Sequence, residues 1–387
     1  MIPWASPYLT FEEINEVVDA IKTGWISMGK RTKLFEEKMA KFNNRKYAIA
    51  VSNGTFALDL ALKAISIRPG DEVILPAMTY IATLNAVLYQ GATPIFADIE
   101  IETYNVDPIS IKKKITQKTK AIIVIDYGGN PCNYRELENI CKNSDIPLIH
   151  DGAQSIGGKY QNKTLCKFGL ISTTSFHVAK PITSVEGGMI FTDDEEIAQK
   201  VNLLRNQGED PEEKYNHLIL GYNARMSDLH AAIGLAQLKK MNRIFRRRTE
   251  IAMAYNEELK SVEEITLPKT ISKCEKKNEM DTPIVKNGWF FYPVLIENRD
   301  SIAKNLRDHG IDTRICYPKP VYDQPFFKRT KYLHVKPYCP VTEYVTARVL
   351  NLPVYHKLKK SQIKHIAKIL KKAIYTNLTK AHALKRY

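Results

Sequence analysis

The chain has 387 residues, of which 44% are hydrophobic and 26% charged, a composition typical of a globular protein long enough for two domains. No apolar run approaches the roughly 20 residues that cross a bilayer, and residues 1–7 lack the basic and apolar regions of a signal peptide. The formal net charge of +15 leaves nucleic-acid binding open, although a positive field also suits a substrate that carries phosphates.

The first half of the chain alternates between helical and strand patterns. Thr10-Phe11-Glu12-Glu13 is a capping box that predicts the start of a helix, and Gly24 predicts its end. A second helix is predicted around Phe35, Met39 and Phe42. Strands are then predicted at 47–51, 73–75, 94–98, 121–125, in a run ending at 151, at 172–176 and at 189–192, with helices near 57–64, 83–89 and 134–141. Such alternation predicts an α/β domain with a mostly parallel sheet.

The pattern changes after Ala224. Helices are predicted at 227–241 and 251–259, a lysine-rich surface loop at 268–287, strands at 288–296 and 313–316, and helices at 301–310 and 361–373. We therefore expect a large α/β domain over residues 1–249 and a smaller α+β domain over residues 250–387.

Lys180 is the first candidate catalytic residue. It follows a strand, lies in a predicted turn, and precedes Glu186-Gly187-Gly188 and another apolar strand. A lysine in such a turn can present its amine at the mouth of a sheet, where a carbonyl cofactor is held as a Schiff base. The amine must be unprotonated for this, and burial lowers the pKa of a lysine towards neutrality. The alternative is an ordinary surface lysine.

Asp151 ends the apolar strand upstream of Lys180, and Gln154 follows three residues later. A carboxylate at one strand end and a lysine at another are the two groups that pyridoxal phosphate needs from its protein. Asp151 would keep the pyridine nitrogen protonated, and Gln154 would reach the phenolic oxygen. The alternatives are that Asp151 caps a following helix and that Gln154 is a polar residue of that helix.

Two further segments carry candidates for the cofactor. Ser52-Asn53-Gly54-Thr55 opens a helix directly after a strand, so its amides predict an anion site, or simply a helix cap. Ser175 is a second phosphate candidate because its hydroxyl lies near Lys180. Tyr80 could stack on a planar ring, or else pack in the core.

Other functional classes find less support. The six cysteines are scattered without Cys-x-x-Cys, so we expect reduced thiols and a cytoplasmic location. His150 and His177 are not at metal-ligand spacing, so no metal is expected. Sequences typical of dinucleotide sites, ATP sites and hydrolases are missing. The densest basic cluster, on a predicted helix, comprises Lys239, Lys240, Arg243, Arg246, Arg247 and Arg248.

Together these motifs resemble the DegT/DnrJ/EryC1/StrS family of sugar aminotransferases, which are pyridoxal-phosphate enzymes of fold type I, the aspartate-aminotransferase fold. The resemblance covers nearly the whole chain. It is carried in order by residues 24–30, 52–55, 70–76, 79–83, 151–155, 175–188, 221–228 and 350–353.

The resemblance implies a role for each matching residue. Lys180 would be the Schiff-base lysine, Asp151 the pyridinium partner, Gln154 the contact to the phenolic oxygen, and Tyr80 the stacking residue. The phosphate would be bound by Gly54, Thr55, Phe56 and Ser175. Asn223 would reach the phosphate of a neighbouring subunit, which implies a homodimer. Tyr317 and Tyr322 would line the sugar-nucleotide site.

This chain departs from the family at three positions. The family usually has glycine at Val185, alanine at Gly152 and histidine at Tyr322. The third departure bears on which sugar is recognised. A related branch of sugar dehydratases has histidine in place of the catalytic lysine, and Lys180 argues against that branch.

The resemblance thus implies an aminotransferase that moves an amino group from L-glutamate to a nucleotide-linked keto sugar, with pyridoxamine phosphate as the intermediate form. Likeness to the perosamine-synthase-like branch favours a 4-keto-6-deoxy sugar and a 4-amino-4,6-dideoxy product. Amination at C3, and a non-catalytic regulatory protein on the same fold, are the alternatives. We expect no membrane or nucleic-acid partner.

Overall fold

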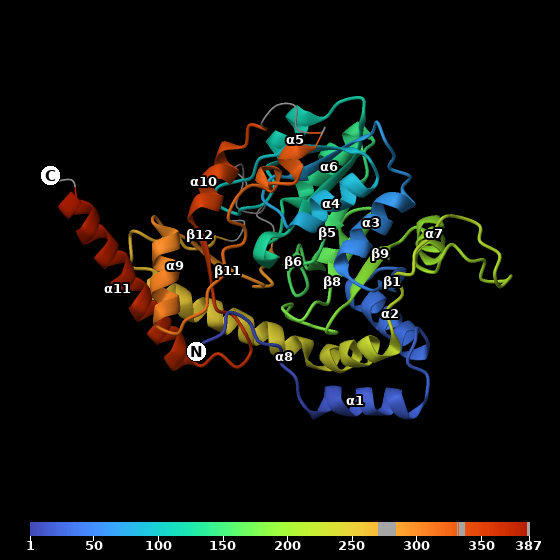
Figure 1. The fold of residues 1–387 in the computed structure, drawn as a ribbon, viewed down its shortest axis with the longest axis horizontal. Coiled ribbons are helices and arrows are strands. Elements are labelled where there is room, and N and C mark those ends of the chain that lie inside the picture. Colours follow the sequence, from blue (N-terminus) through green and yellow to red (C-terminus); the bar gives the residue numbers. More distant parts are fainter. Residues whose placement is uncertain (270–283, 331, 333–336, 385–387) are drawn as a thin grey trace.

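Residues 1–269, 284–330, 332 and 337–384 are described in this computed structural model of the chain. Figure 1 shows a sheet flanked by helices and, beside it, a smaller group of helices and strands. Helix α8 (Asp228–Leu259) runs beneath both parts. Among the described helices, none is both long and apolar enough to cross a membrane.

The central sheet has seven strands in the order β1-β9-β8-β5-β4-β2-β3. Strand β9 is antiparallel to both its neighbours, whereas β8, β5, β4, β2 and β3 run parallel. Their bounds are β1 Tyr47–Val51, β2 Glu72–Pro76, β3 Thr93–Ala97, β4 Thr119–Ile125, β5 Leu148–Asp151, β8 Ile171–Ser175 and β9 Gly188–Thr192. The predicted mostly parallel α/β sheet is confirmed.

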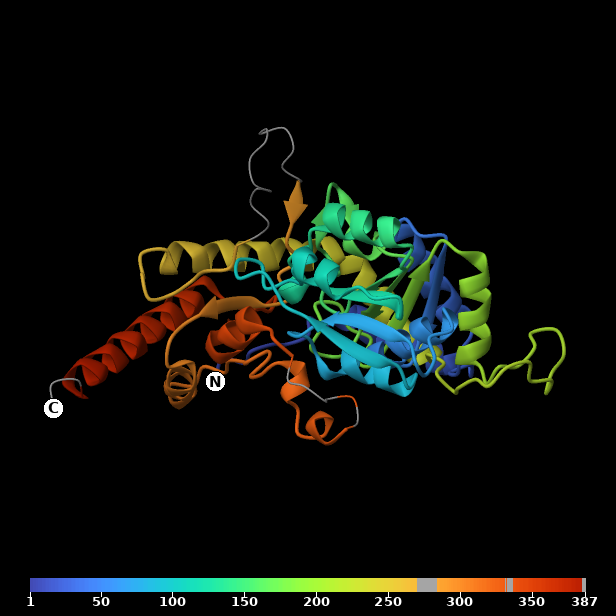
Figure 2. The ribbon, with the colours of Figure 1, turned by 90° about the horizontal axis from the view of Figure 1, so that it is seen from above.

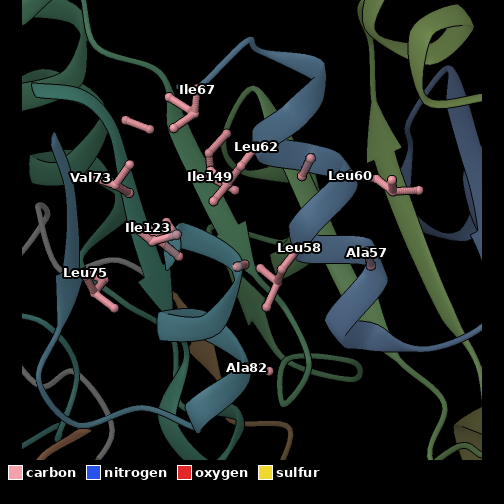
Figure 3. Packing of buried hydrophobic residues seen from close by; sticks show 14 of the residues in the cluster. Ala57, Leu58, Leu60, Leu62, Ile67, Val73, Leu75, Ala82, Ile123 and Ile149 are labelled. Atoms are coloured by element: carbon pink, nitrogen blue, oxygen red, sulfur yellow. The ribbon is translucent and has the colours of Figure 1, made fainter. Parts of the chain in front are cut away.

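Helices cover both faces of this sheet. Since side chains alternate along a strand, neighbouring strand residues pack into different hydrophobic clusters on the two faces. Val73, Leu75 and Ile123 pack beneath α3 (Gly54–Ala64) and α4 (Ile81–Tyr89), as Figure 3 shows. Their neighbours Ile74 and Ile122 pack on the opposite face, against α6 (Tyr134–Ser144). Burial on both faces explains the continuous apolar runs of these strands.

The remaining helices of this part lie at its edges. Helix α1 (Phe11–Lys22) begins at the predicted capping box, with Thr10 as N-cap and Glu13 as its reciprocal partner. Helix α2 (Lys30–Asn43) buries Phe35 and Met39, as predicted. Helices α5 (Pro108–Lys114) and α7 (Glu195–Arg205) were not predicted, and two short strands, β6 (Lys159–Tyr160) and β7 (Lys163–Thr164), form a hairpin.

Helix α8 corrects the prediction of two helices at 227–241 and 251–259, because it is continuous over 32 residues. Residues 242–250 contain no glycine or proline, and their arginines are good helix formers. The first part of α8 packs against α2, with Leu235 and Phe245 in one cluster. The last part, including Tyr255 and Leu259, belongs to the core of the C-terminal part. The expected domain boundary at 249/250 falls inside this helix.

The C-terminal part is built on β11 (Tyr292–Leu295), which pairs antiparallel with β12 (Val349–Leu352). Helices α9 (Arg299–Asp308) and α11 (Lys360–Leu384) contribute to its core, and α10 (Pro340–Arg348) precedes β12. The N-terminus also joins this part, since Ile2 pairs with Ile311. Figure 2 shows α11 extending away from the sheet.

Three further predictions for this part need correction. The predicted strand at 288–296 begins only at Tyr292, because Trp289 adopts a positive φ of 52° that bends the chain. No strand forms at 313–316, where Arg314 makes a single bridge to Asn351. Most of the predicted loop at 268–287 lies outside the described residues, but β10 (Val285–Lys286) pairs with β6.

Candidate active site

A cavity of about 980 Å³ lies at the edge of the sheet where β4, β5 and β8 end. The last residues of these strands, Ile125, Asp151 and Ser175, all line it. Carboxyl ends of parallel strands meet at one edge, where ligands bind in open α/β sheets. Other predicted site residues on its wall are Gly54, Thr55, Phe56, Tyr80, Gln154, Lys180 and Tyr317.

Asp151 is buried between the neighbouring strands, opposite Ile125 and Thr173. Its Oδ2 accepts a hydrogen bond from Thr83 Oγ1 at 2.7 Å, and its Oδ1 accepts one from Ala153 N at 3.2 Å. Both oxygens are thereby oriented, and the carboxylate still lines the cavity. No helix follows Asp151, because residues 153–157 form turns, so the helix-cap alternative is wrong.

Gln154 therefore lies in a turn and not on a helix. Its side chain is held at both ends, because Oε1 accepts from Gly128 N at 2.7 Å and Nε2 donates to the Tyr317 hydroxyl at 3.2 Å. The Tyr317 ring lies 6.0 Å from the ring of Tyr80. Tyr80 is 56% exposed and lines the cavity, so it is not a core-packing residue.

Lys180 lies in the turn between β8 and β9, where its backbone N donates to His177 O at 2.8 Å. Its Nζ lies 4.4 Å from the centroid of the Phe290 ring. Burial lowers the pKa of Lys180 to about 8, although the charge of Asp151 acts in the opposite direction. A larger share of the amine is therefore neutral near physiological pH than for an ordinary lysine.

The start of α3 also lines the cavity. Asn53 caps the helix, since its Oδ1 accepts from Phe56 N at 2.9 Å. The amides of Gly54 and Thr55, like the first amides of any helix, have no acceptor within the helix and remain open to an anion. A Cβ at Gly54 would lie 2.9 Å from Ser175 Cβ, so only glycine lets α3 approach the end of β8 this closely.

The model of the DegT/DnrJ/EryC1/StrS aminotransferase family matches residues 7–371. The chain belongs to this family. It is 37% identical to GDP-perosamine synthase of Escherichia coli O157:H7, over 94% of this chain and 96% of that protein. These findings confirm the family, the enzyme class and the fold.

Solved structures agree. A putative sugar aminotransferase, Spr1654 from Streptococcus pneumoniae in its PMP form, matches with a TM-score of 0.88 and 27% identity, over 97% of this chain and 100% of that chain. Helicobacter pylori PseC, an aminotransferase involved in the biosynthesis of pseudoaminic acid, also has a TM-score of 0.88, at 28% identity over 97% of this chain and 99% of its own. The chain is a pyridoxal-phosphate-dependent sugar aminotransferase.

The residues of this family member fit the cofactor. The cradle between Gly54 and Ser175, which a Cβ would fill, combines open helix amides with a hydroxyl and suits a phosphate group. Asp151 offers an oriented carboxylate to a protonated ring nitrogen, and Lys180 offers a partly neutral amine. Side chains or backbone atoms of Gly54, Ser175, Asp151 and Lys180 all line the cavity.

Two predicted residues lie elsewhere. Tyr322 is buried in the core, with its ring 5.4 Å from that of Phe96 and its hydroxyl donating to Glu343 at 3.1 Å, so it does not line the cavity. Asn223 is exposed and pairs with Asn206 at the base of the segment between α7 and α8, which extends away from the sheet (Figures 1 and 2).

The departure at Val185 has a structural basis. This aminotransferase holds Val185 at a φ of 70°, a conformation that glycine adopts without strain and a β-branched residue rarely does. A glycine there is thus the less strained choice, and Val185 is not among the residues that line the cavity.

Sequence reasoning missed several residues of the site. Thr83 orients Asp151, and the Gly128 amide orients Gln154. Phe290 and Phe291 form a wall beside Lys180. The four consecutive aromatic residues at 289–292 were a signal that could have marked this wall.

Proposed function

We propose that this enzyme transfers the amino group of L-glutamate to C4 of a nucleotide-linked 4-keto-6-deoxy sugar, giving a 4-amino-4,6-dideoxy sugar. The observation that supports amino transfer best is that Lys180 and Asp151, on separate loops and strands, line one cavity. The identity of 37% to a GDP-perosamine synthase supports the choice of C4.

Pyridoxal phosphate, when bound, supplies an electron sink for deprotonation of the amino-acid carbon. Lys180 Nζ would accept that proton and could donate it again, and its lowered pKa raises the fraction of neutral amine that a base requires. The Asp151 carboxylate keeps the ring nitrogen protonated. Gln154 would hold the phenolic oxygen, and Tyr80 would cover the ring face, since both line the cavity.

Room for the sugar substrate remains on the same wall. The cavity of about 980 Å³ is at the upper end of the range for small-molecule sites, so a second ligand fits beside the cofactor. Tyr317 and Tyr89 line it and can donate hydroxyl groups to a sugar. Tyr322 is too deeply buried to take part, which leaves Tyr317 as the proposed sugar contact of the two tyrosines that the family resemblance suggested.

We also propose that the active enzyme is a homodimer. The segment that carries Asn223 exposes Tyr215 and Leu220, the latter 82% exposed, and α1 exposes Phe11 and Ile21 on one face. Apolar surface of this kind is typical of a face that another chain covers. Light scattering that gives twice the chain mass of 44.2 kDa would support this, and the mass of one chain would contradict it.

The experiment is a substrate panel. The purified enzyme receives glutamate labelled at its amino nitrogen together with nucleotide-linked 4-keto and 3-keto sugars carrying UDP, GDP or dTDP. Mass spectrometry should show the label in the amino sugars formed from the 4-keto sugars, together with an equal amount of 2-oxoglutarate. Label only in the amino sugars formed from the 3-keto sugars would favour C3 amination. No label in any product would contradict the proposal.

The rival functions make different predictions. A non-catalytic protein on this fold would leave cofactor absorbance unchanged when glutamate is added. Nucleic-acid binding by the basic cluster of α8 is disfavoured by its contacts, because Lys239 pairs with Glu16, Lys240 pairs with Glu13, and Arg248 is buried.

A further inference from the structure

A short segment before β11, residues 287–291, forms the aromatic wall of the active site. It is held on one side by the loop after β4. Phe290 N donates to Gly128 O at 2.7 Å, and Gly288 N donates to Gly129 O at 2.8 Å. A Cβ at Gly129 would lie 3.1 Å from Gly288 Cα, so the two segments of chain approach as closely as glycine allows.

Arg248 of α8 holds the same segment on the other side. Its Nε donates to Trp289 O at 2.7 Å and its Nη2 donates to Phe290 O at 2.9 Å. The side chain is buried, and within the described part of the chain it has no ion-pair partner. Its neighbour Arg247, in contrast, pairs with Glu250 at the surface.

A buried guanidinium without a carboxylate is costly, and this one uses its Nε and Nη2 donors on two backbone carbonyls. Burial lowers the pKa of Arg248 to about 9, which shows how strongly its surroundings disfavour the charge. The two carbonyls that it binds belong to Trp289, where the chain bends with a φ of 52°, and to the residue that follows. Arg248 therefore fixes the bend that aims Phe290.

The fixed Phe290 ring faces the catalytic amine. Lys180 Nζ lies 4.4 Å from its centroid, within the range of a cation–π contact. The ring has little freedom to move away, because the Phe291 ring lies 4.2 Å from it and the Trp4 ring lies 6.4 Å from it.

The ring has two opposite effects on the amine. Its π face stabilises the charged form, whereas its bulk keeps water from the amine and stabilises the neutral form. The other ionisable groups around the amine come from several elements, and the cavity wall holds Asp151, Cys316, Tyr317, Tyr80, His177 and Glu186. Of these, Asp151 and Cys316 act on the Lys180 charge.

We propose that Phe290, fixed by Arg248, is a positioning residue. Its ring holds the Lys180 amine and limits the access of water to it whenever the amine is not bonded to the cofactor. This inference rests on the proposed function. It gives the C-terminal part of the chain a direct role at the catalytic lysine, since Phe290 leads into β11 and Arg248 lies on the helix that joins both parts.

The test measures the amine and not turnover. Cofactor-free enzyme is mixed with pyridoxal 5'-phosphate at a series of pH values, and the rate of change of visible absorbance is followed. Borohydride reduction and peptide mapping confirm that the adduct is at Lys180. The midpoint of the rate against pH reports the fraction of neutral amine.

Two substitutions of Phe290 should shift that midpoint in opposite directions. Phe290→Leu keeps apolar cover but removes the π face, so the midpoint should fall by about half a pH unit. Phe290→Ala admits water, so the midpoint should rise by about one unit or more. Arg248→Met should raise the midpoint, as Phe290→Ala does. If the methionine variant fails to fold, Arg248→Lys is measured in its place.

Arg247→Met is the matched control, because Arg247 lies next to Arg248 but binds Glu250 and Leu358 O and neither carbonyl of the Phe290 segment, and it should leave the midpoint unchanged. Equal midpoints in the wild type and both Phe290 variants would overturn the inference. A wild-type enzyme that forms no adduct at Lys180 would instead overturn the proposed function, so the two failures are distinguishable.

Discussion

Neighbouring residues of β5 build two different polar sites on the two faces of one sheet. His150 points to the side of α6, where its Nε2 lies 2.7 Å from Asp126 and its Nδ1 lies 2.7 Å from Ser172 Oγ. Asp151 points to the cavity, where it bonds Thr83 and remains open towards Lys180. Alternation along a strand places two adjacent residues in these opposite environments.

The Asp126 carboxylate is fully enclosed. Tyr134 donates to it at 2.8 Å, Cys132 N donates at 2.8 Å, and His150 Nε2 lies 2.7 Å from its Oδ2. A carboxylate surrounded in this way has nothing left to offer a ligand and serves stability. The Asp151 carboxylate keeps one side for a ligand and serves chemistry. Substitutions on the two faces should therefore separate the two roles.

Lys180→Ala should have the largest effect. The variant loses both the covalent attachment and the group that moves the proton, so turnover should fall by more than about 10⁴-fold. The measurement is amino transfer from glutamate by mass spectrometry, with thermal unfolding as the check on folding. Turnover near the wild-type rate in a folded variant would remove Lys180 from the mechanism.

Asp151→Asn should lower turnover by about 10²- to 10⁴-fold, because a neutral amide cannot keep the ring nitrogen protonated. Stability should fall less than in Asp126→Asn, since the single amide oxygen can still accept from Thr83 and only the longer bond from Ala153 N is lost. The readout is the single-turnover rate with glutamate under saturating cofactor. A rate within a few-fold of wild type would place Asp151 with the structural carboxylates.

Asp126→Asn makes the same chemical change on the other face and should have the opposite result. One oxygen cannot serve Tyr134, Cys132 and His150 together, so the free energy of unfolding should fall by about 3–5 kcal/mol. Denaturant titration measures this loss. Turnover per folded molecule should stay close to wild type, and a loss as large as that of Asp151→Asn would contradict the comparison.

The acid limb of stability gives a second readout on Asp126. Burial is the largest single influence on this carboxyl and raises its pKa, but His150, Ser155 and the Cys132 amide together outweigh burial, and the pKa lies below its ordinary value. The unfolded chain therefore takes up this proton first as the pH falls. The contribution of Asp126 is present above about pH 4 and is lost as the pH falls through the native pKa. Asp126→Asn should flatten this limb below about pH 4, between the unfolded and the native pKa of the lost carboxyl.

The sequence indicates one half of this comparison better than the other. Strand ends are marked by apolar runs that stop at a polar residue, so Asp151, Ser175 and the helix start at Gly54 could be placed on one edge. The residues alone suggested cofactor roles for them but left alternatives open, and the family resemblance favoured the cofactor roles. The enclosed site of Asp126 could not be inferred, because its partners come from β5, α6 and a loop, and no local pattern links them.

Residues contributed by loops were equally hidden. Phe290 reaches Lys180 only because the chain bends at Trp289 and Arg248 binds the bend, contacts that depend on tertiary packing. Tyr322 shows the converse error. It lies close in sequence to Tyr317, yet its side chain enters the core beside Phe96 while Tyr317 faces the cavity.

Gly54→Ala should have the smallest effect. It tests whether the close approach of α3 to β8 is needed for phosphate binding on the cavity side of the sheet. The added Cβ would lie 2.9 Å from Ser175 Cβ, so α3 must shift away from β8 and move the amides that bind phosphate. Overpacking of this kind costs about 1–2 kcal/mol, or about tenfold in cofactor affinity, measured by absorbance titration.

The control is a double-mutant cycle with Ser175→Gly, which removes the opposing Cβ at the expense of the hydroxyl. Gly54→Ala should cost less in the Ser175→Gly background than in the wild type, because the steric conflict is gone. An equal cost in both backgrounds would show that Gly54 is needed for its backbone freedom, and the close approach of α3 to β8 would lose its role in phosphate binding.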